Sequence, residues 1–496
     1  MKVRQPLVEA MLNYQAQQVY PLHTPGHKGG RGMASPLKEA LGPAALQLDV
    51  SLMSELDDIH APGGCIKEAQ ALAARLYGSD ACFFAVNGTT QAIHAMFLTA
   101  LAPGEKVLVP RNSHRSVSGG LLLSQARPVY LVPEFLEDFS LYGQITPAQV
   151  EQAFSAHPDL KAVFLTSPNY YGLAADVAGI ARVAHAHGAV LLVDEAHGPH
   201  LGFNKELLPP SALQGGADMC AQSTHKLLGA LTQCSMLQVQ GTRIEVSLAA
   251  EVMSLLTTTS PNYLLLGSLD AARAQLEEQG AALAEAAVQA ARGLRQLLEH
   301  KAGLRLLDKK VIGRAGIAGL DETKITVNLR QWGVSGVEAG EFLRERGLAV
   351  ELVDAENVLF LVTYADLGPE WPGVVERLQR AWEEMEDLAS EDNMFALLPR
   401  KGNLSRMPAP QPLRSLREVF YGRKEVCPLR EAAGRICAEE VSFYPPGIPV
   451  LLPGEVLTPE IITYCKYMKE LGLPVHGAAD ETLATIKVAA DSGCGG

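Results

Sequence analysis

The chain has 496 residues, 47% of them hydrophobic and 20% charged, a size and balance that predict a globular protein of two to four domains. Its formal net charge of −13 at pH 7 disfavours nonspecific nucleic-acid binding and permits a cationic substrate. No apolar run is long enough to span a bilayer and no signal peptide opens the chain, so we expect no membrane contact and a cytoplasmic location.

Short apolar runs alternate with helix-like segments between residues 65 and 245. This alternation predicts an α/β domain with a mostly parallel sheet covered by helices on both faces. The seven expected strands are Ala81–Val86, Lys106–Val109, Pro128–Val132, Ala162–Leu165, Ala189–Val193, Ala217–Ala221 and Ser235–Val239.

A long Ala/Leu/Glu/Arg pattern at Leu269–Lys301 predicts a helix that leaves this core. A second, smaller α/β pattern follows it, and a polar, proline-rich stretch indicates a linker to a last α+β unit. We therefore predict five parts: an N-terminal arm at 1–30, a large domain at 31–300, a small domain at 301–390, a linker at 391–412 and a C-terminal domain at 413–496.

Two loops that follow predicted strands carry polar residues suited to a ligand. Asn87-Gly-Thr-Thr90 opens a helix whose N–H groups and two hydroxyls suit a phosphate, although this motif alone favours an ordinary capped helix. His114 follows the next strand and suits stacking on a cofactor or proton transfer; a surface loop histidine is a comparable interpretation.

The strongest chemical signal is an aspartate and a lysine at the ends of successive strands. Asp194 ends one apolar run, and Ser223-Thr-His-Lys226 follows the next. In a parallel sheet both groups face the crevice where ligands bind. A lysine amine forms Schiff bases and an aspartate holds a pyridinium nitrogen protonated, which are the groups that pyridoxal phosphate chemistry needs. Either motif alone favours a surface lysine and a helix-capping aspartate.

The sequence offers no metal site. Its eight cysteines are scattered without a CxxC pair, which indicates reduced thiols rather than a disulfide framework or a zinc site. His185 and His187 have no matching ligand cluster and indicate a solvated helix end.

These segments resemble one family, the pyridoxal-phosphate-dependent ornithine/lysine/arginine decarboxylases of the aspartate-aminotransferase fold type, or fold type I. The chain resembles the short form of that family, because no receiver-like wing domain precedes His23. The matching motifs are His23-Thr-Pro-Gly-His-Lys28, Leu56-Asp-Asp-Ile-His60, Pro62-Gly-Gly64, Ile66-Lys-Glu-Ala69, Asn87-Gly-Thr-Thr90, Thr166-Ser-Pro-Asn-Tyr-Tyr-Gly172, Asp194-Glu-Ala-His-Gly198, Ser223-Thr-His-Lys226, Ser260-Pro-Asn-Tyr263, Ser268-Leu-Asp270 with Arg273, Tyr444-Pro-Pro-Gly-Ile-Pro449 and Pro453-Gly-Glu455.

The resemblance implies a role for each matching residue. Lys226 would link covalently to pyridoxal phosphate, Asp194 would pair with its ring nitrogen, and His114 would stack on the ring. Catalysis would rest on these three. The cofactor-binding set would be Thr89, Thr90, His114, Asp194, Ala196 beneath the ring, His197, Ser223, His225, Lys226 and, from a neighbouring subunit, Ser260. A homodimer or larger homo-oligomer with its active site at the subunit interface is therefore expected.

The implied reaction is decarboxylation of a basic L-amino acid in polyamine biosynthesis. Arginine, giving agmatine and CO2, is our first expectation, followed by lysine and ornithine. Candidate carboxylates for the cationic end of the substrate are Glu55, Asp57, Asp58, Glu351 and Glu455. An aminotransferase or a C–S lyase of the same fold stays open, as does a scaffold protein that has lost catalysis.

Overall fold

The computed structural model describes residues 3–299, 303–390, 406–444 and 447–490, and the chain forms two compact units that we describe separately. The first unit comprises Met1–Ala102, Val150–Asn169 and Val177–Glu285; the second comprises Pro103–Gln149, Tyr170–Asp176 and Ala286–Gly496. The five-part division expected from sequence stays a prediction. Most of its linker, Pro445, Pro446 and Cys494 lie outside the described residues.

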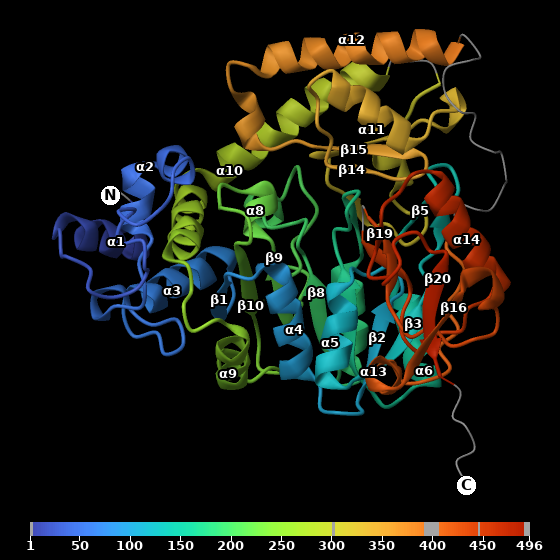
Figure 1. Cartoon of the computed structure of the whole chain (residues 1–496), viewed down its shortest axis with the longest axis horizontal. Coiled ribbons are helices and arrows are strands. Elements are labelled where there is room, and N and C mark those ends of the chain that lie inside the picture. The colour runs from blue at the N-terminus through green and yellow to red at the C-terminus, as the bar shows by residue number, and fades with distance from the viewer. Residues whose placement is uncertain (1–2, 300–302, 391–405, 445–446, 491–496) are drawn as a thin grey trace. The chain divides into compact units, whose positions relative to one another are not determined.

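The predicted sheet of seven mostly parallel strands is confirmed (Figure 1). β6, β8 and β9 are parallel, whereas β10 is antiparallel to both its neighbours, β9 and β1. The first unit contributes β1 (Ala81–Ala85), β10 (Ser235–Val239), β9 (Met219–Gln222), β8 (Val190–Asp194) and β6 (Leu160–Thr166), and the second contributes the parallel pair β2 (Lys106–Pro110) and β3 (Arg127–Leu131).

The strands of the first unit bring polar residues to one sheet edge. Apart from the partly exposed Val190, the apolar side chains of β8 and β9 are buried, as expected for strands covered on both faces. Because these strands are parallel, Asp194 and the segment after Gln222 lie at the same, carboxyl edge. The helices of this unit are α1 (Pro6–Ala16), α2 (Leu37–Leu48), α3 (Cys65–Tyr77), α4 (Gly88–Ala100), α6 (Pro147–Ala156, which begins in the second unit), α7 (Val177–Ala186), α8 (Thr224–Leu227), α9 (Val246–Leu256) and α10 (Tyr263–Glu299, which ends in the second unit).

The second unit contains a small antiparallel sheet in the order β11 (Arg305–Leu306), β13 (Lys324–Asn328), β15 (Asn357–Leu361) and β14 (Leu352–Val353). Helices α11 (Gly336–Glu345) and α12 (Trp371–Ser390) lie on one side of β14 and β15 (Figure 1). Ser335 caps α11 through a capping box with Glu338, and Trp382 of α12 is fully buried in the core beneath.

The C-terminal part of the second unit is α+β, as expected. Its hydrophobic core includes Leu451, Ile461 and Val488. It consists of α13 (Leu416–Tyr421), β16 (Lys424–Pro428) paired with β20 (Thr485–Ala489), the sheet of β18 (Ile448–Leu451), β17 (Val441–Phe443) and β19 (Val475–His476), and α14 (Pro459–Glu470). The remaining short strands form two antiparallel pairs, β4 (Phe135–Leu136) with β5 (Leu141–Tyr142) and β7 (Leu173–Ala174) with β12 (Gly319–Leu320). Helix α5 spans Ser116–Ser124.

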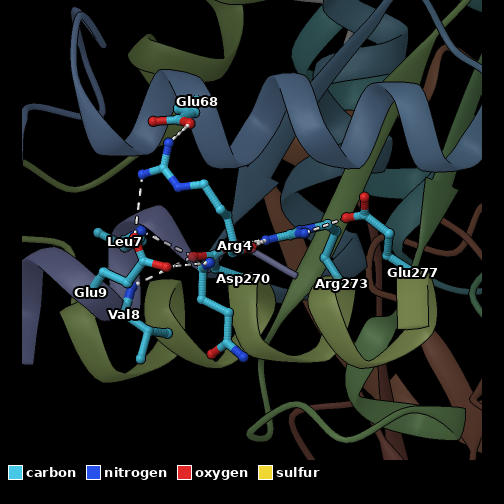
Figure 2. A network of polar contacts seen from close by, with 9 residues as sticks. Arg4, Leu7, Val8, Glu9, Glu68, Asp270, Arg273 and Glu277 are labelled. Atoms are coloured by element: carbon cyan, nitrogen blue, oxygen red, sulfur yellow. Dashed lines mark hydrogen bonds and ion pairs between the residues drawn. The ribbon is translucent and has the colours of Figure 1, made fainter. Parts of the chain in front are cut away.

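Within the first unit, helix α1 is joined to α10 by contacts with a buried ion pair (Figure 2). The first N–H groups of a helix have no partner within the helix, and here Asp270 of α10 accepts those of Leu7 at 2.9 Å and Val8 at 3.4 Å. Arg273 donates to Asp270 at 2.6 Å and to the Arg4 carbonyl at 2.5 Å. Asp270 and Arg273 are both fully buried, which gives this sequence motif a structural role.

Asp270→Asn is expected to destabilise the folded protein by about 3–5 kcal/mol, because it removes the fully buried carboxylate that pairs with Arg273 and leaves this buried charge only the more exposed Glu277. Urea unfolding followed by circular dichroism measures this change. Glu277→Gln is the matched control: Glu277 bonds Arg273 at 2.6 Å but is 41% exposed, so its loss should cost less than about 1 kcal/mol. Equal unfolding midpoints for the two variants would contradict the structural role of Asp270.

Candidate active site

Asp194 is a buried carboxylate at the carboxyl end of β8. It is 3% exposed, and its Oδ1 accepts the Ala196 N–H at 3.0 Å. Burial raises the pKa of Asp194 to about 6, although the positive charge of Lys226 and the Ala196 N–H act in the opposite direction. A carboxylate held in such a place is stabilised by a cation close to it.

Lys226 lies on the short helix α8, which begins directly after β9 and Ser223. Its Nζ is 2.7 Å from Nε2 of His197, a buried residue that follows β8. Since a protonated amine only donates, His197 Nε2 accepts from the charged form of Lys226. The structure thus brings Lys226 and His197 together, a contact that strand periodicity could not predict.

The predicted phosphate cradle lies at the N-terminus of α4. Gly88 has φ +68°, and a Cβ added there would meet no atom within 4 Å, so the turn is open on that side. Thr89 Oγ1 bonds the Ser235 hydroxyl at 2.5 Å and also the Ser223 hydroxyl. These buried hydroxyls tie α4 to β9 and β10, whereas Thr90 is exposed at the first turn.

His225, next to Lys226, is fixed by the Cys234 carbonyl. Its Nδ1 is 2.8 Å from that oxygen and is therefore the donor. Burial lowers the pKa of His225, which favours the neutral ring with an unprotonated Nε2. A hydrogen bond from Nε2 to a phosphate would require the ring to be protonated, and the negative charge of a phosphate favours that form.

Two further predicted residues keep their roles as predictions. Ser260 is exposed after α9, and its contacts in the described part of the chain are with Thr258, at 3.2 and 3.3 Å. His114 belongs to the second unit, where its Nδ1 accepts the Ser116 N–H at 3.2 Å and is 2.9 Å from the Ser116 hydroxyl. Nδ1 is therefore unprotonated, and a neutral His114 carries its proton on Nε2.

Comparison with known proteins assigns the chain to a family. Residues 5–368 match the Orn/Lys/Arg decarboxylase major domain, and residues 400–482 match the Orn/Lys/Arg decarboxylase C-terminal domain. The chain belongs to the Orn/Lys/Arg decarboxylase family. A Bacillus anthracis protein named arginine decarboxylase is 40% identical over 97% of this chain and 97% of its own length. The arginine decarboxylase of Bacillus subtilis (strain 168) is 38% identical over the same shares.

Solved structures confirm the predicted fold type of this decarboxylase family. The lysine decarboxylase LdcF of Francisella novicida superposes with a TM-score of 0.85 at 23% identity, covering 98% of this chain and 81% of that one. The constitutive lysine decarboxylase of E. coli gives 0.80 at 23% identity, covering 98% and 82%. The Sphingomonas wittichii serine palmitoyltransferase gives 0.51 at 19% identity, covering 66% and 77%.

Two of the family's acidic motif residues turn out to support the backbone. Asp57 accepts the N–H groups of Gly63, Gly64 and Ile66 at 2.9, 2.8 and 3.0 Å, and so caps α3. Asp58 accepts the His60 N–H at 2.9 Å. Among the three carboxylates of this segment, Glu55 is the exposed one.

Glu195 is a buried carboxylate of the family motif that sequence reasoning did not single out. It is fully buried and accepts from the Ala212 N–H at 2.6 Å, Gln222 Nε2 at 2.8 Å and Cys220 Sγ at 3.2 Å. These contacts join the end of β8 to β9 and to the loop before it. The only signal available from sequence was its position beside Asp194, because its partners are distant along the chain.

The buried acids predict a pH dependence of the cofactor-free protein. Burial raises the pKa of Glu195 from its ordinary value of 4.5 to about 7, and that of Asp194 from 3.8 to about 6. At a pH between the ordinary and the raised pKa values, the folded state binds more protons than the unfolded state. The free energy of unfolding should therefore fall as pH rises from about 4 to 7. Urea unfolding at successive pH values measures this slope, and Glu195→Gln should flatten it. An unchanged slope in that variant would contradict the assignment.

Within residues 3–299, 303–390, 406–444 and 447–490, no group of three or more His, Cys, Asp or Glu side chains could hold a metal ion. Within the same ranges, no helix has the length and apolar character needed to cross a membrane.

Proposed function

We propose that this chain uses pyridoxal phosphate to decarboxylate L-arginine to agmatine and CO2. The observation that carries the proposal is that a buried carboxylate, Asp194, ends β8, and a lysine, Lys226, lies on the short helix directly after the adjacent parallel strand β9. Arginine is preferred because two Bacillus relatives that are 38% and 40% identical over 97% of the chain bear the name arginine decarboxylase.

The residues of the first unit fit pyridoxal phosphate. Asp194 is 3% exposed and has a raised pKa, so a protonated pyridine nitrogen would supply a cation that stabilises its charged form. Lys226 offers a primary amine for the cofactor aldehyde, and the first turn of α4 offers N–H groups and the Thr90 hydroxyl for its phosphate. When bound, the cofactor supplies the aldehyde and a protonated ring that accepts the electrons left as CO2 departs.

The chain's own residues would orient the reaction and move protons. Asp194 keeps the proton on the ring nitrogen, since its negative charge in a dry site favours the charged ring. Lys226 or His114 returns a proton to the substrate Cα. The 2.7 Å contact between Lys226 Nζ and His197 Nε2 gives the lysine a partner that can take or supply that proton.

A basic substrate agrees with the charge of the chain. The formal net charge of −13 attracts a cation, and Glu55 is an exposed carboxylate in the segment between α2 and α3. Neither Asp57 nor Asp58 is proposed as a substrate ligand, because both carboxylates accept backbone N–H groups.

The deciding experiment is CO2 release by the purified, cofactor-loaded protein given L-arginine, L-lysine or L-ornithine separately. L-arginine should give CO2 and agmatine in equal amounts. Faster CO2 release from lysine or ornithine would show that this amino acid, and not arginine, is the preferred substrate. A protein that binds the cofactor but releases no CO2 from any of the three would contradict decarboxylation, and formation of a keto acid would then indicate an aminotransferase.

We also propose that the protein acts as a cytoplasmic homodimer or larger homo-oligomer in polyamine biosynthesis. Exposed apolar side chains on the N-terminal arm and α9 support self-association; they include Tyr20, Leu22 and Leu255, which are 66%, 88% and 78% exposed. Light scattering after size-exclusion chromatography measures the assembly, and a monomer at micromolar concentration would contradict it.

A further inference from the structure

Arg111, directly after β2, is buried and donates hydrogen bonds to the C-terminal part of the second unit. Its Nε and one terminal nitrogen bond the Glu455 carboxylate at 3.2 and 2.9 Å. It also donates to the carbonyls of Pro449 at 2.5 Å and Val450 at 3.2 Å, and its guanidinium lies over the Tyr130 ring of β3, 5.6 Å from the ring centre. Arg111 and Glu455 side chains are each 2% exposed, so water screens neither charge.

The segment that presents Glu455 is itself held in one conformation. Gly454 has φ +99°, and a Cβ added there would lie 2.3 Å from the Arg414 carbonyl, so only glycine fits. The second oxygen of Glu455 also accepts the Leu452 N–H at 2.8 Å. The conformation of the Pro453-Gly-Glu455 motif therefore orients the Glu455 carboxylate toward Arg111.

A second set of contacts lies on the other side of His114. The Arg115 N–H donates to the Gly447 carbonyl at 3.3 Å, and the Arg115 side chain pairs with Glu440 at 3.1 Å. Ser118 donates to the same Glu440 carboxylate at 2.8 Å. A Cβ added at Gly447 would lie 3.9 Å from His114 Cδ2, so Gly447 borders the imidazole ring itself.

We propose that the Arg111–Glu455 pair positions His114: the C-terminal part of the chain, through residues 440–444 and 447–455, sets the place of the imidazole that the cofactor needs. Contacts fix the His114 loop at two positions. Glu455 bonds Arg111, three residues before His114. Gly447 and Glu440 bond Arg115, one residue after it. Glu455 is then a positioning residue and not a substrate ligand. The link to the cofactor rests on the proposed function, whereas the effect on His114 does not.

The test compares Glu455→Gln with the unsubstituted chain in two measurements. The first is the rate at which diethyl pyrocarbonate modifies His114 in the cofactor-free protein, mapped by peptide mass spectrometry. The second is the dissociation constant of pyridoxal phosphate, measured by equilibrium dialysis. Glu455→Gln should change the His114 rate at least threefold and weaken cofactor binding about tenfold.

The matched control is Glu425→Gln, which removes a carboxylate of the same C-terminal part that pairs with the more exposed Arg435. It should leave both measurements unchanged. Arg111→Lys keeps the positive charge but loses the two-point contact, and it should give the same changes as Glu455→Gln to a smaller degree.

A folded Glu455→Gln protein with an unchanged His114 rate or unchanged cofactor affinity would overturn the proposal. If both Glu455→Gln and Arg111→Lys fail to fold, the Arg111–Glu455 pair serves only to stabilise the fold, and the positioning proposal is overturned as well. Absence of decarboxylation by the unsubstituted chain counts only against the proposed function, because the His114 rate is measured without cofactor or substrate.

Discussion

Lys226→Ala is expected to reduce amine production from L-arginine by at least about 10³-fold. The substitution removes the amine that links to the cofactor and also a proton carrier, and general acid–base groups alone contribute about 10²–10⁴-fold. It also removes the partner of His197 Nε2, which lies 2.7 Å from Lys226 Nζ. Steady-state assays of CO2 and amine measure the loss.

Lys205→Ala is the matched control, because Lys205 is an exposed lysine of the same unit and should be dispensable. Borohydride reduction of the cofactor-loaded protein, followed by peptide mapping, should label Lys226 in the unsubstituted chain and give no label there in Lys226→Ala. Unchanged amine production by Lys226→Ala, or a label on a different lysine in the unsubstituted chain, would disprove the assigned role.

Asp194→Asn is expected to lower kcat by about 10²–10⁴-fold. Breaking a buried ion pair by removing one partner costs about 3–5 kcal/mol, and every 1.36 kcal/mol in a barrier is tenfold in rate. Asparagine keeps the shape of the side chain but cannot hold the proton on the ring nitrogen by charge. Single-turnover measurements with L-arginine separate this effect from changes in substrate binding.

The cofactor-free Asp194→Asn protein should be at least as stable as the unsubstituted chain at pH 8, because burial disfavours the charged carboxylate there. Asp218→Asn is the control for a buried aspartate: Asp218 is 2% exposed and pairs with His185 at 2.8 Å, so it should lose stability and keep its kcat. A kcat within threefold of the unsubstituted value in Asp194→Asn would contradict the role of Asp194.

Local patterns were enough to predict the large sheet. Each of the seven expected strands begins and ends within two residues of its predicted bounds. A short apolar run between polar turns is typical of a buried strand in a large core. The reversed direction of β10 could not be predicted in this way, because an apolar run reads the same in a parallel and an antiparallel pair.

The acidic candidates show where local patterns fail. Local sequence does not distinguish four of these acids: Glu55, Asp57, Asp58 and Glu455. In the structure, Asp57 accepts N–H groups at the N-terminus of α3, and Glu455 pairs with Arg111. The partner of Glu455 is 344 residues away along the chain. No spacing rule covers such a distance, so residue type alone could not separate a substrate ligand from a structural ion pair.

The sequence by itself determined the strand positions, the family through its ordered motifs, and the candidacy of Asp194 and Lys226, because each of these follows from residues close together along the chain. Only the tertiary structure decided that Asp270 holds the N-terminal helix, that Glu195 joins β8 to β9 and that His197 contacts Lys226. A side chain's role depends on its burial and on which charges and N–H groups reach it. Those partners come from distant segments, and folding alone brings them within bonding distance.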